Sequence, residues 1–360
     1  MKLSKLLCST LGSLLLAASW LALARAASVD EIMLYNKPDR QKMLVEGARK
    51  EGKILWYTSL IVDQVVRPVK EAFEKKYPFI QIEYSRSNSE RLVQKIFAEY
   101  QGQRYEVDIA DGTVTAPMIK KGGYLQRFYS PHLADYPAEL KDPQGYWGVS
   151  NVYYFALGYN TRMVKPNEVP KTYEDLLNPR WKGQMMWSTS RGSGAPLFIG
   201  NILKTMGQEG GKAYLQKLKA QNVAKTTASN RQILDLVIAG EYPLGLHIFH
   251  HHAFISKSAG APVDWAPLEP LSATINTISP VTRSPHPHSA MLLLDFILSE
   301  EGQKVIQAAN YLPSHPKVPA KQADLKPGGG RFKRALYFTP DSQVNEGDAW
   351  VDYFEKNFLK

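Results

Sequence analysis

The sequence predicts an α/β protein with two lobes, each built around an open sheet. Two series of alternating strand and helix patterns support this prediction, one over residues 53–112 and the other over residues 153–249. A strand–helix–strand order favours parallel strands joined by right-handed crossovers. The chain has 360 residues, of which about 334 follow an N-terminal leader, and this length exceeds what one hydrophobic core usually supports.

Residues 1–26 are typical of a cleaved secretory signal peptide. Lys2 and Lys5 give a positive start, residues 6–23 are mostly apolar, and Ala24-Arg-Ala26 matches an A-x-A cleavage site. An uncleaved membrane anchor is the alternative, but the apolar stretch is short for a membrane span. The single cysteine, Cys8, lies within this leader. We therefore expect a mature protein without disulfides, thiolate metal sites or a cysteine nucleophile.

The charge pattern argues against a nucleic-acid-binding surface. Loss of Lys2, Lys5 and Arg25 with the leader lowers the formal net charge from +10 to +7. The remaining basic residues are spread along the chain, and acidic residues interrupt most of the denser stretches. A small anionic ligand is compatible with this charge.

The first series of elements follows from hydrophobic spacing. Residues 53–58 form an apolar run that predicts a strand, and residues 65–77 have the spacing of a helix. Residues 80–84 alternate like a strand. Ser87-Asn-Ser-Glu90 matches a capping box ahead of a helix, and residues 107–111 predict the next strand.

The second series repeats this order and ends at a run of histidines. It comprises a strand, a short capped helix, a strand, a long helix, a capped helix and a final strand. The strands are expected at residues 153–159, 185–188 and 244–249. The helices are expected after Thr172, from about Pro196, and between the capping box at Ser229 and Gly240.

Polar residues follow the predicted strands, where helices begin. Open parallel sheets bind ligands beyond the carboxyl ends of their strands, where helix N-termini present free N–H groups. We therefore predict a polar cleft that binds an oxygen-rich anion through arginine guanidinium groups and hydroxyl groups. Its predicted residues are Thr58, Ser59, Arg86, Ser87, Asn88, Ser89, Asp111, Gly112, Thr113, Ser188, Ser190, Arg191, Gly192, Ser193, Ser229 and Asn230.

Each of these residues has an ordinary structural alternative. A serine at a helix start is often only a cap. Arg86 and Arg191 can instead pair with neighbouring acids such as Glu90. Tyr153 joins the predicted set because it can pack against a ligand ring, with burial in the core as its alternative.

Three adjacent histidines, His250, His251 and His252, follow the last strand. If the strand continues through them, His250 and His252 face one way and His251 the other, so one metal ion cannot take all three without a bend. The nearest carboxylates in sequence are Glu241 and Asp264. The run therefore predicts a metal site only weakly.

Four phrases resemble one protein family. They are "AFEKKYPFIQIEYSRSNSERL" at residues 72–92, "TYEDLLNPRWKGQM" at 172–185, "IAGEYPLGL" at 238–246 and "LLLDFILSEEGQKVIQAANYLP" at 292–313. Together they resemble the substrate-binding proteins of bacterial ABC importers, in the group with ferric-iron-binding and sugar-phosphate-binding members. The resemblance covers almost all of the chain after the leader.

This resemblance implies the type II periplasmic-binding-protein fold, two open α/β domains joined by a two-strand hinge. The first lobe is expected at residues 27–118 and 268–316, and the second at residues 119–267 and 317–360. The implied protein is a periplasmic, monomeric receptor without a cofactor or enzymatic activity. It closes on a small solute and delivers it to an ABC permease in the inner membrane.

The resemblance also bears on the histidines. Ferric-binding relatives carry a pair of tyrosines at this point, where the present sequence has His250 and His251. Ferric iron prefers oxygen donors such as phenolate, so these histidines are expected to donate hydrogen bonds to an organic, phosphorylated or carboxylated solute. The alternatives are ferric iron or an iron chelate held by His250 and His251, and a secreted serine hydrolase using Ser193 and His250. No G-x-S-x-G, H-E-x-x-H or P-loop motif supports an enzyme.

Overall fold

The computed structural model describes residues 28–359, so the predicted signal peptide at residues 1–26 lies outside the described residues. The strands are β1 (Lys53–Thr58), β2 (Gln81–Arg86), β3 (Ile109–Gly112), β4 (Gly148–Asn160), β5 (Met185–Ser188), β6 (Ala224–Thr226), β7 (Leu244–Phe249), β8 (Val263–Ala266), β9 (Leu271–Pro280), β10 (Leu312–Pro313) and β11 (Ala335–Phe338).

The α-helices are α1 (Val29–Met33), α2 (Arg40–Glu51), α3 (Arg67–Lys76), α4 (Ser89–Gln101), α5 (Thr115–Lys121), α6 (Ala195–Lys219), α7 (Asn230–Ala239), α8 (His250–Ser258), α9 (Pro287–Leu298), α10 (Glu300–Ala308) and α11 (Pro340–Phe354). Short 3-10 or π-helical turns lie at Val62–Val66, Pro131–Ala134, Ala138–Leu140, Glu174–Leu177, Pro179–Trp181, Ala323–Leu325 and Glu355–Leu359.

One curled, 11-stranded sheet carries both predicted series, with the main order β2-β1-β3-β9-β4-β7-β5-β6. The pairs β2–β1, β1–β3, β7–β5 and β5–β6 are parallel, as predicted. The expectation of purely parallel sheets is wrong for β4 and β9. These two strands pair with each other and with their neighbours β3 and β7 in antiparallel fashion.

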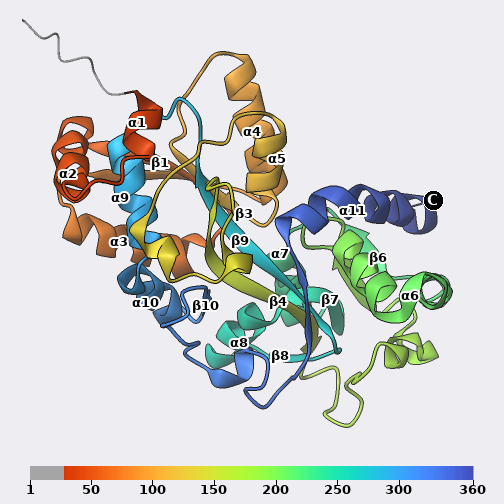
Figure 1. Cartoon of the computed structure of the whole chain (residues 1–360). Helices are drawn as coiled ribbons and strands as arrows, with labels where there is room; N and C mark the ends of the chain where they lie inside the picture. Colours follow the sequence, from red (N-terminus) through yellow and green to blue (C-terminus); the bar gives the residue numbers. More distant parts are fainter. Residues whose placement is uncertain (1–27, 360) are drawn as a thin grey trace, which may run out of the picture.

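β4 joins the two series because it is long enough to belong to both. Its residues up to Tyr154 pair with β9, and its residues from Phe155 onward pair with β7 and β8. We call β2, β1 and β3 with α2–α5 and α9 the β1 side, and β7, β5 and β6 with α6–α8 and α11 the β5 side. Figure 1 shows these two groups at opposite ends of β4 and β9.

Several predicted boundaries are confirmed and others shift. β1, β5 and β7 have the predicted bounds, and the capping box of α7 forms between Ser229 and Gln232. The capping box expected at Ser87 does not form. Asn88 caps α4 instead, because its Oδ1 atom accepts a hydrogen bond from the Arg91 amide at 2.9 Å.

The histidine run belongs to a helix, and this corrects the assumption that the strand continues. β7 ends at Phe249, whose backbone is still extended, and α8 begins at His250. Successive residues of a helix point about 100° apart, so the three imidazoles leave the helix in three directions.

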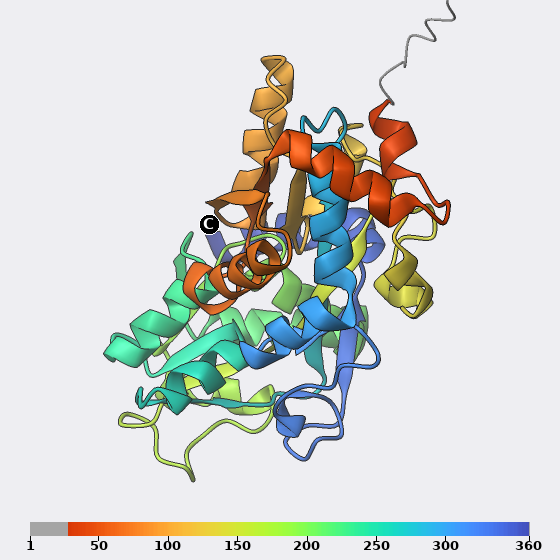
Figure 2. The same cartoon turned by 90° about the vertical axis from the view of Figure 1, so that its left-hand side faces the viewer.

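Helix α9 is buried on nearly all sides. It packs against α2 and against strands β1, β4 and β9, and Figure 2 shows it crossing α2. Arg40 of α2 forms an ion pair with Asp295 of α9, and both residues are buried. The carboxylate of Glu51 accepts hydrogen bonds from the His288 and Ser289 amides, which satisfies the free N–H groups at the start of α9.

No helix between residues 28 and 359 is both apolar enough and long enough to cross a membrane.

A buried carboxylate ties the start of α9 to the sheet. Asp108 is fully buried and accepts hydrogen bonds from the Leu55 amide at 2.7 Å and the Ser284 hydroxyl at 2.6 Å. It also accepts one from His286 Nδ1 at 3.0 Å, and this hydrogen bond raises the pKa of the His286 imidazole. A raised folded-state pKa stabilises the protein below about pH 6.5, and this contribution is lost as the pH rises through the folded-state value.

We expect His286→Asn to remove this contribution while keeping a side-chain amide near Asp108. The free energy of urea unfolding, measured for both proteins from about pH 5.5 to 8.5, gives the test. The difference between wild type and variant should be largest at low pH and should shrink as the pH rises. A difference that stays constant over this range would contradict the role assigned to the ion pair.

Candidate functional site

A small cavity of about 60 Å³ lies between the β1 side and the β5 side. We call it the central cavity. The carboxyl ends of strands from both sides meet around it, together with the N-termini of α4, α7 and α8. Its lining residues are Ser59, Ile61, Arg86, Asn88, Ser89, Glu90, Thr113, Tyr153, Ser190, Ser193, Thr227, Ala228, Ser229, Asn230, Arg231, Phe249, His252 and Tyr311.

On the β1 side, a buried carboxylate positions the loop after β1. Asp111 accepts hydrogen bonds from the Ser59 amide and the Ser59 hydroxyl, each at 3.0 Å, and from Trp56 Nε1 at 2.8 Å. Asn276 of β9 donates a further hydrogen bond at 3.1 Å. Burial raises the pKa of Asp111, although these donors favour its charged form. Asp111 thus fixes the loop after β1, which forms part of the cavity wall.

On the β5 side, Asn230 and His247 hold the loop that precedes α6. Asn230 Nδ2 donates to the carbonyl oxygens of Ser193 and His247, both at 2.7 Å. The two ring nitrogens of His247 lie 3.1 Å from the Ser193 carbonyl and 2.9 Å from the Ser272 hydroxyl. The ring also stacks on Phe155 with centroids 4.1 Å apart. Burial lowers the pKa of His247 to about 3, so this imidazole is neutral.

Glu90 connects the two sides directly. It lies in the first turn of α4, and its Oε1 atom accepts hydrogen bonds from the Ser190 hydroxyl at 2.9 Å and the Gly192 amide at 3.1 Å. Both donors belong to the loop after β5. The β1 side and the β5 side are therefore in contact around the central cavity.

The charges at the cavity are mainly positive. Arg86 forms no side-chain hydrogen bond or ion pair with any other residue between 28 and 359. Arg231 pairs with Asp235 and donates to the Ser256 hydroxyl at 2.9 Å. Glu90 is the one acidic residue among the lining residues of the described chain. The arginines, the hydroxyl groups and the helix N-termini suit an anion that carries several oxygens.

The three histidines have different surroundings. His250 Nε2 lies 2.8 Å from the Leu325 carbonyl, outside the cavity. His251 stacks on Tyr153 at 5.4 Å between centroids, and neither of its nitrogens has a hydrogen-bond partner among the described residues. His252 lines the cavity, with Nε2 3.0 Å from the Tyr311 hydroxyl. Burial lowers the pKa of all three, so they are neutral at physiological pH.

The structure brings together about half of the residues predicted for the cleft. Those that line the central cavity are Ser59, Arg86, Asn88, Ser89, Thr113, Tyr153, Ser190, Ser193, Ser229 and Asn230. Those that do not line it are Thr58, Ser87, Asp111, Gly112, Ser188, Arg191, Gly192, His250 and His251.

The residues outside the cavity have other contacts. Arg191 turns away from the cavity to form an ion pair with Asp348 of α11, beside a separate cavity of about 340 Å³. The Ser188 hydroxyl donates to the Ala228 carbonyl at 2.7 Å, and the Gly112 carbonyl accepts from Thr277 at 2.8 Å.

Four functional candidates at the cavity were not predicted: Glu90, Arg231, His252 and Tyr311. Arg231 lies within the capping box Ser229-Asn-Arg-Gln232, so its position at a helix N-terminus is visible in the sequence. His252 belongs to the histidine run, but only the helix explains why it alone of the three lines the cavity. Tyr311 follows α10 and carried no sequence signal.

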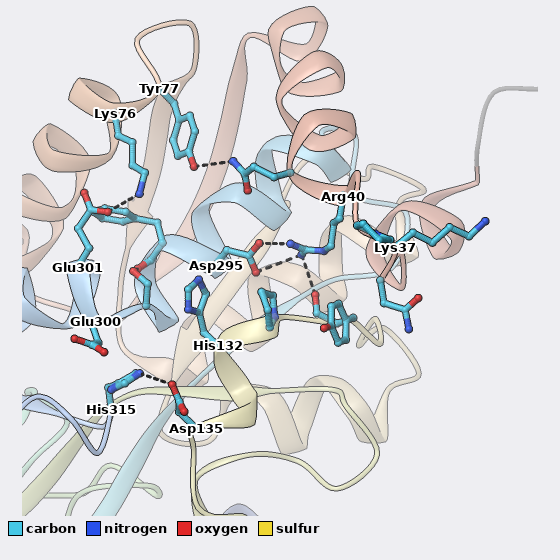
Figure 3. Close-up of a pocket in the computed structure, with 17 residues that line it drawn as sticks. Lys37, Arg40, Lys76, Tyr77, His132, Asp135, Asp295, Glu300, Glu301 and His315 are labelled. Carbon is cyan, nitrogen blue, oxygen red and sulfur yellow. Dashed lines mark hydrogen bonds and ion pairs between the residues drawn. The ribbon is translucent and has the colours of Figure 1, made fainter.

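A larger cavity of about 830 Å³ lies elsewhere, between α2, α9, the start of α10 and the 3-10 turn at Pro131–Ala134. In Figure 3, Arg40 faces Asp295, Lys76 faces Glu301 and His315 faces Asp135, whereas Lys37 points away from them. Arg40 pairs with Asp295, Lys76 with Glu301, and Asp135 with both His315 and Lys317. Because these charges already neutralise one another, the small central cavity is the stronger candidate site despite its size.

Comparison with known proteins shows the family to which the chain belongs. A family model described as bacterial extracellular solute-binding protein matches residues 109–333. The chain belongs to this family. The predicted resemblance to the periplasmic binding proteins of ABC importers is thus confirmed, and members of this family are transport components, not enzymes.

Individual relatives of this solute-binding protein have different ligands in their names. It is 21% identical over 343 residues to the Fe(3+)-binding periplasmic protein of Serratia marcescens, covering 89% of this chain and 93% of that protein. Its fold is similar to AfuA from Actinobacillus pleuropneumoniae with exogenous fructose-6-phosphate bound, with a TM-score of 0.74, 20% identity, and coverage of 86% of this chain and 99% of that one.

The same fold occurs in iron-bound HitA from Pseudomonas aeruginosa, with a TM-score of 0.69, 23% identity, and coverage of 84% and 98% of the two chains. The predicted α/β fold of the type II periplasmic binding proteins is confirmed by these similarities. At these identities the neighbours establish the fold of this solute-binding protein and leave its solute to be argued from the site.

The contact between the two sides depends on a small residue at position 192. A Cβ atom added to Gly192 would lie 2.5 Å from Val114 Cγ1 and 3.2 Å from Thr113 Oγ1 of the β1 side. Valine has little freedom to turn away. We therefore expect Gly192→Ala to hold the two sides further apart, which small-angle X-ray scattering will detect as a larger radius of gyration.

Gly210→Ala is the matched control. Gly210 lies in α6, and an added Cβ would have Met206 Cβ at 3.8 Å as its nearest neighbour. This variant should keep the wild-type radius. Equal radii for Gly192→Ala and wild type would show that the contact around Gly192 does not hold the two sides together.

Proposed function

We propose that this protein is the periplasmic receptor of an ABC importer for a small organic anion, phosphorylated or carboxylated. The observation that carries this proposal is the unpaired guanidinium of Arg86 at the central cavity, among hydroxyl groups and helix N-termini of both sides. A guanidinium with free donors matches the paired oxygens of a phosphate or carboxylate.

The size of the cavity supports a movement of the two sides. A volume of about 60 Å³ holds water molecules but is well below the several hundred Å³ of typical ligand sites. We propose that the sides separate to admit the solute and close over it, with β4 and β9 as the two hinge strands. The lobes expected from the sequence are residues 27–118 with 268–316, and residues 119–267 with 317–360. With β4 as a hinge strand, residues 119–147 would instead move with the first lobe, because Leu125 pairs with Val281 and the Tyr129 amide donates to the Met33 carbonyl.

Ferric iron is the main competing solute, because relatives with that ligand in their names share the fold. The chemistry of the site favours the organic anion. Residues 28–359 contain no group of three or more His, Cys, Asp or Glu side chains arranged to hold a metal ion. Two phenols lie at the cavity, Tyr153 and Tyr311, and burial raises the pKa of each, which disfavours the phenolate that iron prefers.

A serine hydrolase finds little support. His250, the expected base, is directed to the Leu325 carbonyl, and the Ser193 hydroxyl lies 3.2 Å from the Ser190 hydroxyl. The proposed partners are therefore the solute and an ABC permease, which would receive the solute from the closed protein.

Arg86→Gln tests the assignment of the anion site. Thermal-shift screening of phosphorylated sugars and carboxylates will identify a ligand of the wild type, because a bound ligand raises the apparent stability by mass action. We expect Arg86→Gln to weaken that ligand at least about tenfold, or about 1.4 kcal/mol, in calorimetric titration.

Arg191→Gln is the control, because Arg191 pairs with Asp348 away from the central cavity. It removes the same charge and should leave the affinity nearly unchanged. Equal effects of both substitutions would place the anion elsewhere. A visible charge-transfer band on addition of ferric iron, without binding of any organic anion, would favour the iron alternative.

A further inference from the structure

The histidine that lines the central cavity has one ring nitrogen fixed and one free. His252 is only 4% exposed and belongs to the first turn of α8. Its Nε2 atom lies 3.0 Å from the Tyr311 hydroxyl. Its Nδ1 atom is buried and has no hydrogen-bond partner among the described residues.

The neighbours of His252 determine which nitrogen carries the proton. The Tyr311 hydroxyl donates its own proton to Gln64 Oε1 at 3.3 Å, so its oxygen is free to accept from His252. The tautomer that carries its proton on Nε2 satisfies both of these hydrogen bonds and leaves a lone pair on Nδ1. Burial and the nearby charges of Arg231 and Arg86 lower the pKa of His252, so the ring does not take up a second proton.

A buried acceptor without a partner is costly, and a ligand that donates a hydrogen bond removes this cost. An ionised phosphate or carboxylate oxygen cannot do so, because it is itself only an acceptor and would repel the lone pair. The group of the ligand that meets His252 must carry a proton, as an alcohol does.

We infer that His252 Nδ1 accepts a hydrogen bond from a hydroxyl group of the solute, and that His252 thereby selects hydroxylated anions over their deoxy analogues. This inference rests on the proposed function and narrows its solute class to anions that also carry alcohol groups. The arginines bind the anionic group of the solute, while His252, on the β5 side, binds a hydroxyl group elsewhere in the solute.

The test uses hexose 6-phosphates, each of their monodeoxy analogues, and inorganic phosphate as an anion without alcohol groups. Calorimetric titration gives the affinity of each for the wild type and for His252→Phe, which keeps an aromatic ring and removes the acceptor. We expect the wild type to bind one monodeoxy analogue at least about tenfold more weakly than its parent sugar phosphate.

In His252→Phe this preference should disappear, because the parent loses affinity while that deoxy analogue and inorganic phosphate do not. His252→Asn, whose Oδ1 is an acceptor close to the position of Nδ1, should restore part of the preference. His250→Phe is the control within the run, since His250 is bonded to the Leu325 carbonyl, and it should keep the preference. Circular dichroism and melting curves confirm that each variant is folded.

The outcomes separate this inference from the proposed function. If Arg86→Gln weakens the sugar phosphates but His252→Phe weakens parent and deoxy analogues equally, or neither, the inference is wrong and the proposed function stands. If no organic anion binds to the wild type, the proposed function fails, and the inference fails with it.

Discussion

The site depends on the direction in which β4 runs relative to the strands on either side of it. β4 runs parallel to the strands of the β1 side, since both β3 and β4 are antiparallel to β9. It is antiparallel to β7. The strands of the β1 side therefore run toward the middle of β4 from one end, and β7 and β5 run toward it from the other. Their carboxyl ends meet near Tyr153, and the helix N-termini that follow them enclose one cavity.

Buried polar residues hold the loops at this meeting point in place. Asp111 fixes the loop after β1, and His247 with Asn230 fixes the loop before α6. Each polar group is isolated from water, so a lost partner would cost more than an ordinary hydrogen bond contributes. Asp111 and His247 do not line the cavity, whereas Asn230 does, and all three determine where Ser59 and Ser193 lie. The binding surface is thus positioned in part by residues that lie outside it.

Local patterns predicted the elements of this protein better than their arrangement. β1, β5 and β7 have the expected bounds because short apolar runs between turn residues are local signals. The antiparallel pairing of β4 and β9 joins residues more than 100 positions apart, and no local pattern encodes it. The same reason explains why the sequence could not show that Arg86 lines the cavity and Arg191 does not. Both follow strands, but only the tertiary structure shows that Asp348 of a distant helix turns Arg191 away.

The histidine run illustrates how one local change alters the chemistry of a site. A strand would have placed two imidazoles on one face, whereas the helix sends the three rings in different directions. His250 reaches the Leu325 carbonyl, His251 packs between Tyr153 and Tyr311, and His252 reaches the cavity. The rings of His251 and His252 lie 4.3 Å apart between centroids, yet residues 28–359 contain no group of three His, Cys, Asp or Glu side chains arranged to hold a metal ion. Positive charge at the cavity comes from the arginines, and this charge is the basis for the oxygen-rich anion that we propose as the ligand.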